Sequence, residues 1–188
     1  MLSFCISQHI SKIQIVAKYE MNMNWISPNL PDSMFFAFDS FNFAGFSDIT
    51  SDCFDVEHDV IEPPVSLGNW CRLTFPHDDN NYGDCWENDF DMNIFTQDIR
   101  NKNNNYLESN YIQWELEFNA SLAPGRVKLF LINDEIWESC NYNFEYNNQN
   151  YNFSIQDTLE FWNYFQGFNQ SSDVIFKIGE CNDLSNFN

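Results

Sequence analysis

The clearest hydrophobic pattern lies at residues 111–118, where apolar and polar side chains alternate one by one. A period of two is typical of a strand with one buried face. The sequence therefore predicts a half-buried strand, whose core face consists of Ile112, Trp114, Leu116 and Phe118.

Several other segments read as strands because they are rich in aromatic and β-branched residues and are bounded by turn residues. We expect strands at 34–46 (with a break near Asp39), 69–75, 126–132 and 173–180. Residues 141–146 and 151–153 bracket the Asn-rich stretch 147–150, which predicts a hairpin loop.

Two segments have apolar residues at helical spacing. Ser154 and Asp157 resemble a helix capping box, and the apolar residues after Ser154 predict an amphipathic helix over about 155–166, ending before Gly167. The helical face would consist of Ile155, Leu159, Trp162 and Phe165. Near the N-terminus, the same spacing is set by Leu2, Ile6, Ile10, Ile13 and Ala17.

These elements predict an α+β fold, with a mostly antiparallel sheet and the C-terminal helix packed on one face. We expect a single domain over residues 21–181 and a loose tail at 182–188. Residues 1–20 are interpreted as an N-terminal helix or as an amphipathic extension upstream of Met21.

Composition narrows the classes of partner. The chain has 188 residues, with 28 acidic and 8 basic side chains and a net charge of −20. Its aromatic content of 18% argues against intrinsic disorder. The few Lys and Arg residues argue against direct binding of nucleic-acid phosphates. No apolar run reaches the 18 residues that a membrane helix needs.

The six cysteines are spread along the chain without a CxxC pair. Polar residues interrupt the apolar part of the N-terminus, so the sequence does not predict a secretory signal. We therefore expect reduced, mostly buried cysteines and a cytoplasmic location.

The strongest regional feature is the acidic segment, which runs from Asp32 to Asp98 with 15 acidic residues and a single basic one, Arg72. Aromatic residues interleave with its carboxylates, and such side chains often anchor interfaces. The predicted partner-binding residues are Trp70, Asp78, Asp79, Tyr82, Asp84, Trp86, Glu87, Asp89, Phe90 and Asp91.

Metal and catalytic patterns are weak. Residues 78–89 match an EF-hand loop only in part. The cysteines and histidines at 53, 58, 71, 77 and 85 lack the tight spacing of zinc sites. Glu115 and Glu117 are two carboxylates on the polar face of the strand at 111–118, and such i, i+2 pairs are common without any acid/base role. We predict no cofactor, no metal and no enzymatic activity.

The sequence favours the first of three functions, and the other two are alternatives. The first is a non-enzymatic acidic inhibitor, similar in character to immunity proteins and antitoxins, that neutralises a basic toxin such as a nuclease. The second is a phage anti-restriction or anti-defence protein that mimics the charge of DNA. The third is an aromatic-rich β module that binds carbohydrate through exposed rings and Asn or Asp side chains.

Overall fold

The computed structural model describes residues 11–22, 29, 35–47, 50–51, 53–64, 67–77, 83–86, 94–101, 111–132, 140–154, 156–167 and 171–179. These residues form eleven strands and one short 3-10 helix, η2 (Gly83–Trp86). The strands are β1 (Ser11–Asn22), β2 (Phe35–Ser47), β3 (Val60–Ile61), β4 (Cys71–Pro76), β5 (Ile94–Asn101), β6 (Tyr111–Ala120), β7 (Gly125–Ile132), β8 (Asn141–Tyr146), β9 (Gln149–Phe153), β10 (Leu159–Asn163) and β11 (Ser172–Gly179).

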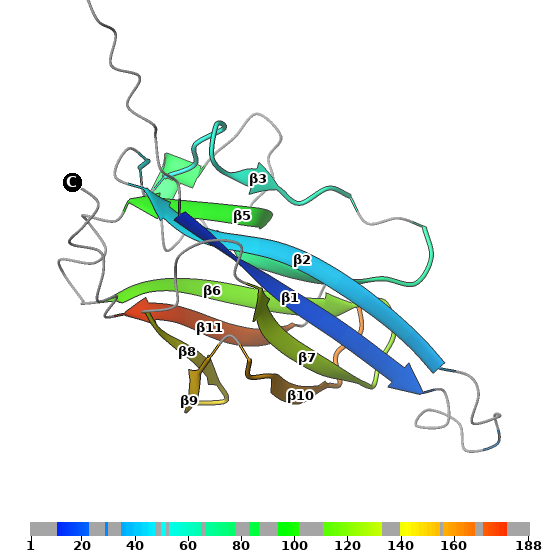
Figure 1. Ribbon diagram of the computed structural model, residues 1–188. Helices are drawn as coiled ribbons and strands as arrows, with labels where there is room; N and C mark the ends of the chain where they lie inside the picture. Colours follow the sequence, from blue (N-terminus) through cyan, green and yellow to red (C-terminus); the bar gives the residue numbers. More distant parts are fainter. Residues whose placement is uncertain are drawn as a thin grey trace, which may run out of the picture.

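The strands belong to one continuous sheet in the order β10-β7-β1-β2-β5-β4-β6-β11-β8-β9, with β3 paired to β5 (Figure 1). Every pairing is antiparallel except that between β2 and β5. The sheet curls over until its two ends approach each other, which gives a nearly closed, barrel-like fold.

Aromatic side chains fill the space between the two halves of the curled sheet. The Tyr19 ring of β1 lies 5.4 Å from the Phe118 ring of β6, measured between centroids. At the open seam, Phe161 of β10 stacks on Tyr146 of β8 at 4.3 Å. This contact packs β10, the first strand of the sheet, against β8, the strand next to the last one.

The predicted N-terminal helix is wrong for the residues that the structure describes. Residues 11–22 form β1, which pairs with both β2 and β7. The strand continues without a break through the boundary expected between residues 20 and 21. Ile13, Ile15, Ala17, Tyr19 and Met21 alternate into the core and are fully buried. Pairing with two neighbouring strands, together with apolar side chains at every second position, favoured a strand over the helix that the i, i+3 and i+4 spacing predicted. Residues 1–10 lie outside the described residues.

The predicted C-terminal helix is also wrong. The contacts of the expected capping box form, since Asp157 Oδ2 accepts hydrogen bonds from the Ser154 backbone N–H and hydroxyl. They close a turn, and the chain then continues as β10, which buries Leu159 and Phe161 against β7. The fold is therefore all-β in the described residues, and the predicted α+β class is wrong.

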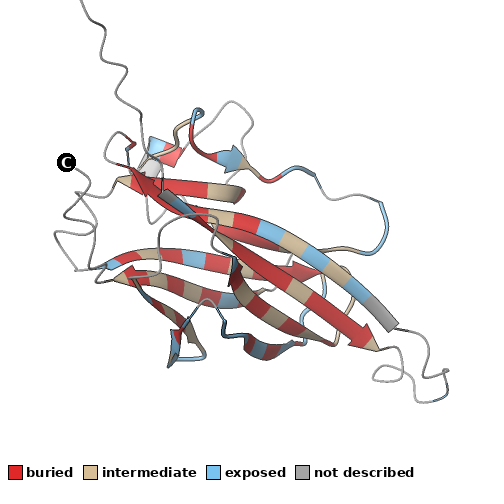
Figure 2. Cartoon of the chain, viewed as in Figure 1, coloured by how far each residue is buried: buried red, intermediate tan, exposed pale blue. Residues whose placement is uncertain are grey.

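Several predicted strands are confirmed. The core face of β6 is as expected, because Ile112, Trp114, Leu116 and Phe118 are each at most 2% exposed. Figure 2 shows buried residues alternating with more exposed ones along the strands. The hairpin between β8 and β9 turns through Asn147 and Asn148, whose φ angles of 51° and 60° suit a tight two-residue turn.

The expectation of reduced cysteines is wrong for part of the chain. Cys53 and Cys85 form a disulfide, and Cys140 is also disulfide-bonded. Cys71 is the free thiol among the described cysteines, and burial raises its pKa to about 12. Disulfides are typical of oxidising compartments. The cytoplasmic location stays a prediction.

No helix in the described part of the chain is long and apolar enough to cross a membrane.

Candidate functional site

The structure describes two of the predicted partner-binding side chains. Trp70 is half-buried just before β4, with its ring 5.9 Å from the Arg72 guanidinium carbon. Trp86 is only 3% exposed. Asp84 lies in η2, but its side chain is outside the described residues, as are all of Asp78, Asp79, Tyr82, Glu87, Asp89, Phe90 and Asp91.

Trp86 belongs to the core of the structure. Its ring stacks on His77 with 3.3 Å between centroids, and the Phe95 ring meets its edge at 5.1 Å. The backbone of Phe54 donates a hydrogen bond to the carbonyl of Cys85, next to Trp86. The disulfide and η2 thus seat Trp86 inward, where it does not present a surface to a partner.

Part of the acidic segment is also buried. Asp59, Glu62 and Asp98 are at most 9% exposed, whereas Asp39 and Glu57 are exposed. Counting charges along the sequence therefore overstates the negative surface that this segment offers.

The deepest charged group is the buried ion cluster of His77, Asp98 and Arg100. His77 Nε2 lies 3.0 Å from Asp98 Oδ2, and Arg100 Nη2 lies 2.9 Å from the same oxygen. Burial favours a neutral Asp98, but the Arg100 charge and the bonds from His77 and Arg100 outweigh it and lower the pKa of Asp98 to about 2. Burial lowers the pKa of His77, against the opposite effect of Asp98.

This cluster occupies a gap in the sheet. β4 ends at Pro76, so it separates β5 from β6 only part of the way. Beyond that point, Arg100 Nη1 donates a 2.7 Å hydrogen bond to the Gln113 carbonyl of β6. His77 and Asp98 are both 0% exposed, so no substrate reaches them. The cluster is structural, although a His–Asp pair can act as an acid/base pair elsewhere.

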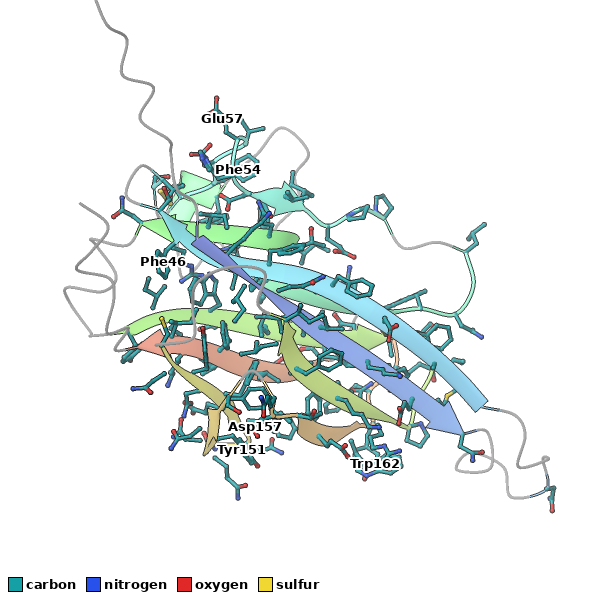
Figure 3. All side chains as sticks on the ribbon, viewed as in Figure 1. Phe46, Phe54, Glu57, Tyr151, Asp157 and Trp162 are labelled. Carbon is teal, nitrogen blue, oxygen red and sulfur yellow. A yellow bond between two sulfur atoms is a disulfide. The ribbon has the colours of Figure 1, made fainter. Side chains whose placement is uncertain are left out.

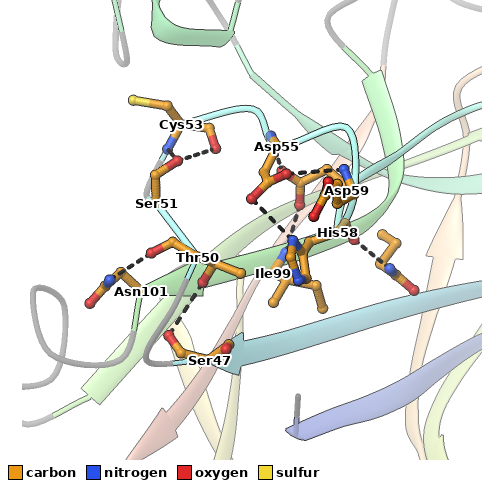
Figure 4. Close-up of polar contacts among 11 residues, drawn as sticks. Ser47, Thr50, Ser51, Cys53, Asp55, His58, Asp59, Ile99 and Asn101 are labelled. Atoms are coloured by element: carbon orange, nitrogen blue, oxygen red, sulfur yellow. Dashed lines mark hydrogen bonds and ion pairs between the residues drawn. The ribbon is translucent and has the colours of Figure 1, made fainter. Parts of the chain in front are cut away.

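A polar loop covers the outer side of β5 (Figure 4). Asp59 accepts hydrogen bonds from the backbone N–H groups of Asp55 and Ile99, both at 2.8 Å. His58 Nδ1 lies 3.0 Å from Asp55 Oδ2. Burial, followed by the nearby Asp98 and Asp55 charges, raises the pKa of Asp59 to about 7.

The most exposed aromatic group lies at the end of β10 and is called here the β10 aromatic site: Trp162, Tyr164 and Phe165. These side chains are 39%, 71% and 38% exposed. The rings of Trp162 and Tyr164 are near parallel, with a 24° interplanar angle and 6.3 Å between centroids. Figure 3 labels Trp162 on the outer side of β10. Exposed large aromatics that gather in one place usually mark a binding surface.

Buried contacts hold this site in place. The Asn163 side chain is fully buried and donates a 2.8 Å hydrogen bond to the Phe165 carbonyl. The Gly167 N–H bonds to the Ala120 carbonyl at 2.8 Å, with a φ of 82° that suits glycine. These contacts fix the backbone turn that carries Tyr164. Little conformational entropy of the backbone would therefore be lost when a ligand binds.

An ion-pair network borders the site on the outer face of β1, β7 and β10. Arg126, opposite Trp162 in the register, lies 2.9 Å from Glu20 and 3.8 Å from Glu160. Lys128 lies 3.0 Å from Glu20. Partial burial favours a neutral Glu20, but hydrogen bonds and charges of Lys128 and Arg126 outweigh it and lower its pKa. The guanidinium and the Glu160 carboxylate remain partly exposed.

A second exposed feature is a like-charged pair on the outer face of β6 and β11. Glu117 stands directly opposite Asp173 in the antiparallel register. Burial, followed by the Asp173 charge, raises the pKa of Glu117. Like charges directly opposite each other destabilise a sheet.

The described residues contain no group of three side chains suited to hold a metal ion. Two of the zinc candidates, Cys53 and Cys85, are joined to each other. His58 and His77 face Asp55 and Asp98. Most of the weak EF-hand match at 78–89 lies outside the described residues.

The comparisons add no relative, since no family model, curated protein or solved structure matches the chain.

Proposed function

We propose that the protein is a non-enzymatic β module that binds carbohydrate at the β10 aromatic site. One observation carries this proposal: Trp162 and Tyr164 expose near-parallel rings beside the partly exposed Arg126–Glu160 ion pair. The negative π face of an aromatic ring attracts the C–H groups on the face of a sugar ring.

The polar neighbours supply the second half of sugar recognition. A guanidinium carries donors in a fixed plane, and a carboxylate carries acceptors, so together they can bond the hydroxyls at a sugar edge. Arg126 is 40% exposed and Glu160 is 49% exposed at the side chain, so both can reach a ligand above the rings. The all-β architecture and the disulfide also support the carbohydrate-binding β module, the last of the three functions that the sequence left open.

The test is retention on polysaccharides. Native affinity electrophoresis in gels containing cellulose derivatives, xylan, mixed-linkage β-glucan or soluble chitin should slow the wild-type chain in at least one gel. Trp162→Ala and Tyr164→Ala should each weaken that retention at least tenfold. Tyr111→Ala is the matched control, because Tyr111 is 38% exposed on β6, outside the site.

Ionic strength separates this proposal from a charge-driven one. Binding to a neutral polysaccharide should be the same at 50 mM and 500 mM salt, since no ion pair forms. If no gel retains the wild-type chain, or if Tyr111→Ala weakens retention as much as Tyr164→Ala does, the proposal is wrong.

A second candidate is the acidic inhibitor of a basic protein, which the Glu117–Asp173 pair favours. A cationic partner would relieve the repulsion between these carboxylates, so a like-charged pair on this face suits such a partner. Glu117→Gln combined with Asp173→Asn should slow association with a basic nuclease and should not lower stability. An association rate that the double variant leaves unchanged would rule out this face.

A further inference from the structure

The outer face of β2, β1 and β7 is unusually apolar for a solvent-facing sheet surface. Strand register places Phe41, Val16 and Phe130 in one cross-strand row, and Phe43, Gln14 and Ile132 in the next. We call these two rows the apolar rows. Polar residues normally occupy the solvent-facing positions of an antiparallel sheet.

Exposure confirms the outward direction at the two ends of the rows, whereas Val16 in the middle is only 2% exposed and adds little accessible apolar area. Phe41 is 53% exposed and Ile132 is 37% exposed, whereas the inward neighbours Ala44 and Leu131 are at most 2% exposed. Phe43 is half-buried beneath the Lys12 ammonium, which sits 4.7 Å from its ring centroid.

Charge on the same face differs from charge on the rest of the molecule. The face carries four of the eight basic residues and three carboxylates, a net charge of +1 in a chain of −20. The remaining residues therefore sum to −21. The charged positions of the face are Lys12, Lys18, Arg126, Lys128, Glu20, Asp39 and Glu160.

We propose that two copies of the chain dimerise through the apolar rows. Two molecules that each carry −20 repel one another strongly wherever their acidic surfaces meet. This face is near neutral and carries both signs, so a copy can set its cations against the other's carboxylates. A two-fold contact requires such a self-complementary surface.

The size of the face sets the expected strength. The stretch of β1 from Lys12 to Glu20 spans about 27 Å at a rise of ~3.4 Å per residue, and four strands span about 19 Å. Each copy would bury about 500 Å², which lies at the lower end for specific interfaces. The dimer should therefore be weak and reversible, with a Kd of tens to hundreds of micromolar.

Sedimentation velocity of the full chain from 10 to 500 µM tests the proposal. The wild-type chain should shift reversibly from monomer to dimer, and the dimer should strengthen between 50 mM and 500 mM salt as the −20 charges are screened. Phe41→Asp should weaken dimerisation at least tenfold. Val60→Asp is the matched control, because Val60 is 47% exposed on β3, away from this face.

Ile132→Asp, at the end of β7, serves as a second variant if Phe41→Asp does not fold. A wild-type chain that stays monomeric at 500 µM in both salts overturns the proposal and leaves the face to a different occupant. A dimer that Phe41→Asp and Ile132→Asp leave intact, or that weakens as salt rises, also overturns it. Because the face includes Arg126 and Glu160, a dimer would cover part of the carbohydrate site, so retention is measured at 1 µM chain, where the weak dimer is dissociated. Loss of polysaccharide retention at that concentration, with dimerisation unchanged at 500 µM, would affect only the carbohydrate proposal.

Discussion

Replacing Arg100 with Met should destabilise the protein through the charge that it leaves behind. Arg100 donates hydrogen bonds to both oxygens of Asp98, at 2.9–3.2 Å, and to the Gln113 carbonyl. Asp98 is fully buried. Met keeps much of the Arg volume but offers no donor, so Asp98 would retain only its contact with His77.

The expected loss is about 3–5 kcal/mol at pH 7, the usual range when one partner of a buried ion pair is removed. That is a large share of the ~5–15 kcal/mol by which domains are stable. Urea denaturation followed by tryptophan fluorescence measures the loss. Arg126→Met is the matched control: it also breaks ion pairs, but its side chain is 40% exposed, so about 0–1 kcal/mol should be lost.

The pH dependence gives a second check. The lowered pKa of Asp98 means that its wild-type contribution is complete above about pH 4 and is lost as pH falls toward about 2. In Arg100→Met the carboxyl should protonate at a higher pH, because burial is no longer opposed by the guanidinium. The gap between wild type and variant should therefore narrow on acidification. A loss below 1 kcal/mol at pH 7, or a gap equal at pH 7 and pH 3, would refute this reasoning. Adding Asp98→Asn to Arg100→Met should restore part of the stability.

Three other outcomes can be measured in the same assay. Trp114→Ala should lower the free energy of unfolding by about 3–5 kcal/mol, because the indole is fully buried. A variant as stable as the wild type would show that the core does not need this indole. The raised pKa of Asp59, about 7, should make wild-type stability fall by up to about 4 kcal/mol from pH 4 to pH 7. Asp59→Asn should flatten this slope, and an unchanged slope would assign it to other groups. Cys53→Ser should lose about 3–4 kcal/mol, from a loop with a sequence separation of 32, whereas Cys71→Ser should change stability much less.

The sequence predicted strands well where one face is purely apolar, as on β6. It failed for β5, where the sequence pattern predicts no strand. Asp98 and Arg100 occupy positions opposite Ala44 and Phe46, on the core side of the sheet. A charged residue at a core position breaks the alternation of apolar and polar residues. Only the fold brings His77 next to Asp98, and this contact stabilises the buried charge.

The β10 aromatic site was missed for a different reason. Residues 159–164 fit both periods, since a helix aligns Leu159 with Trp162, while a strand aligns Trp162 with Tyr164. Pairing with β7, 30–38 residues earlier in the chain, selects the strand and places Trp162 on the outer face. The pattern of residues 159–164 alone carries no information about pairing with β7. The alternation that puts Glu160, Trp162 and Tyr164 on one face of a strand was the sequence signal that could have predicted this site.

The place of β1 between β2 and β7 also sets an order of events during synthesis. β2 follows β1 closely, but roughly 100 residues separate Asn22 from Gly125, where β7 begins. A ribosome that adds ~5–20 residues per second needs about 5–20 s to make them. Throughout that interval the nascent β1–β2 hairpin has an unpaired edge, at which chains aggregate. Lys18 interrupts the apolar side chains along the stretch of β1 that later pairs with β7, and its charge opposes aggregation at this edge until β7 has been synthesised.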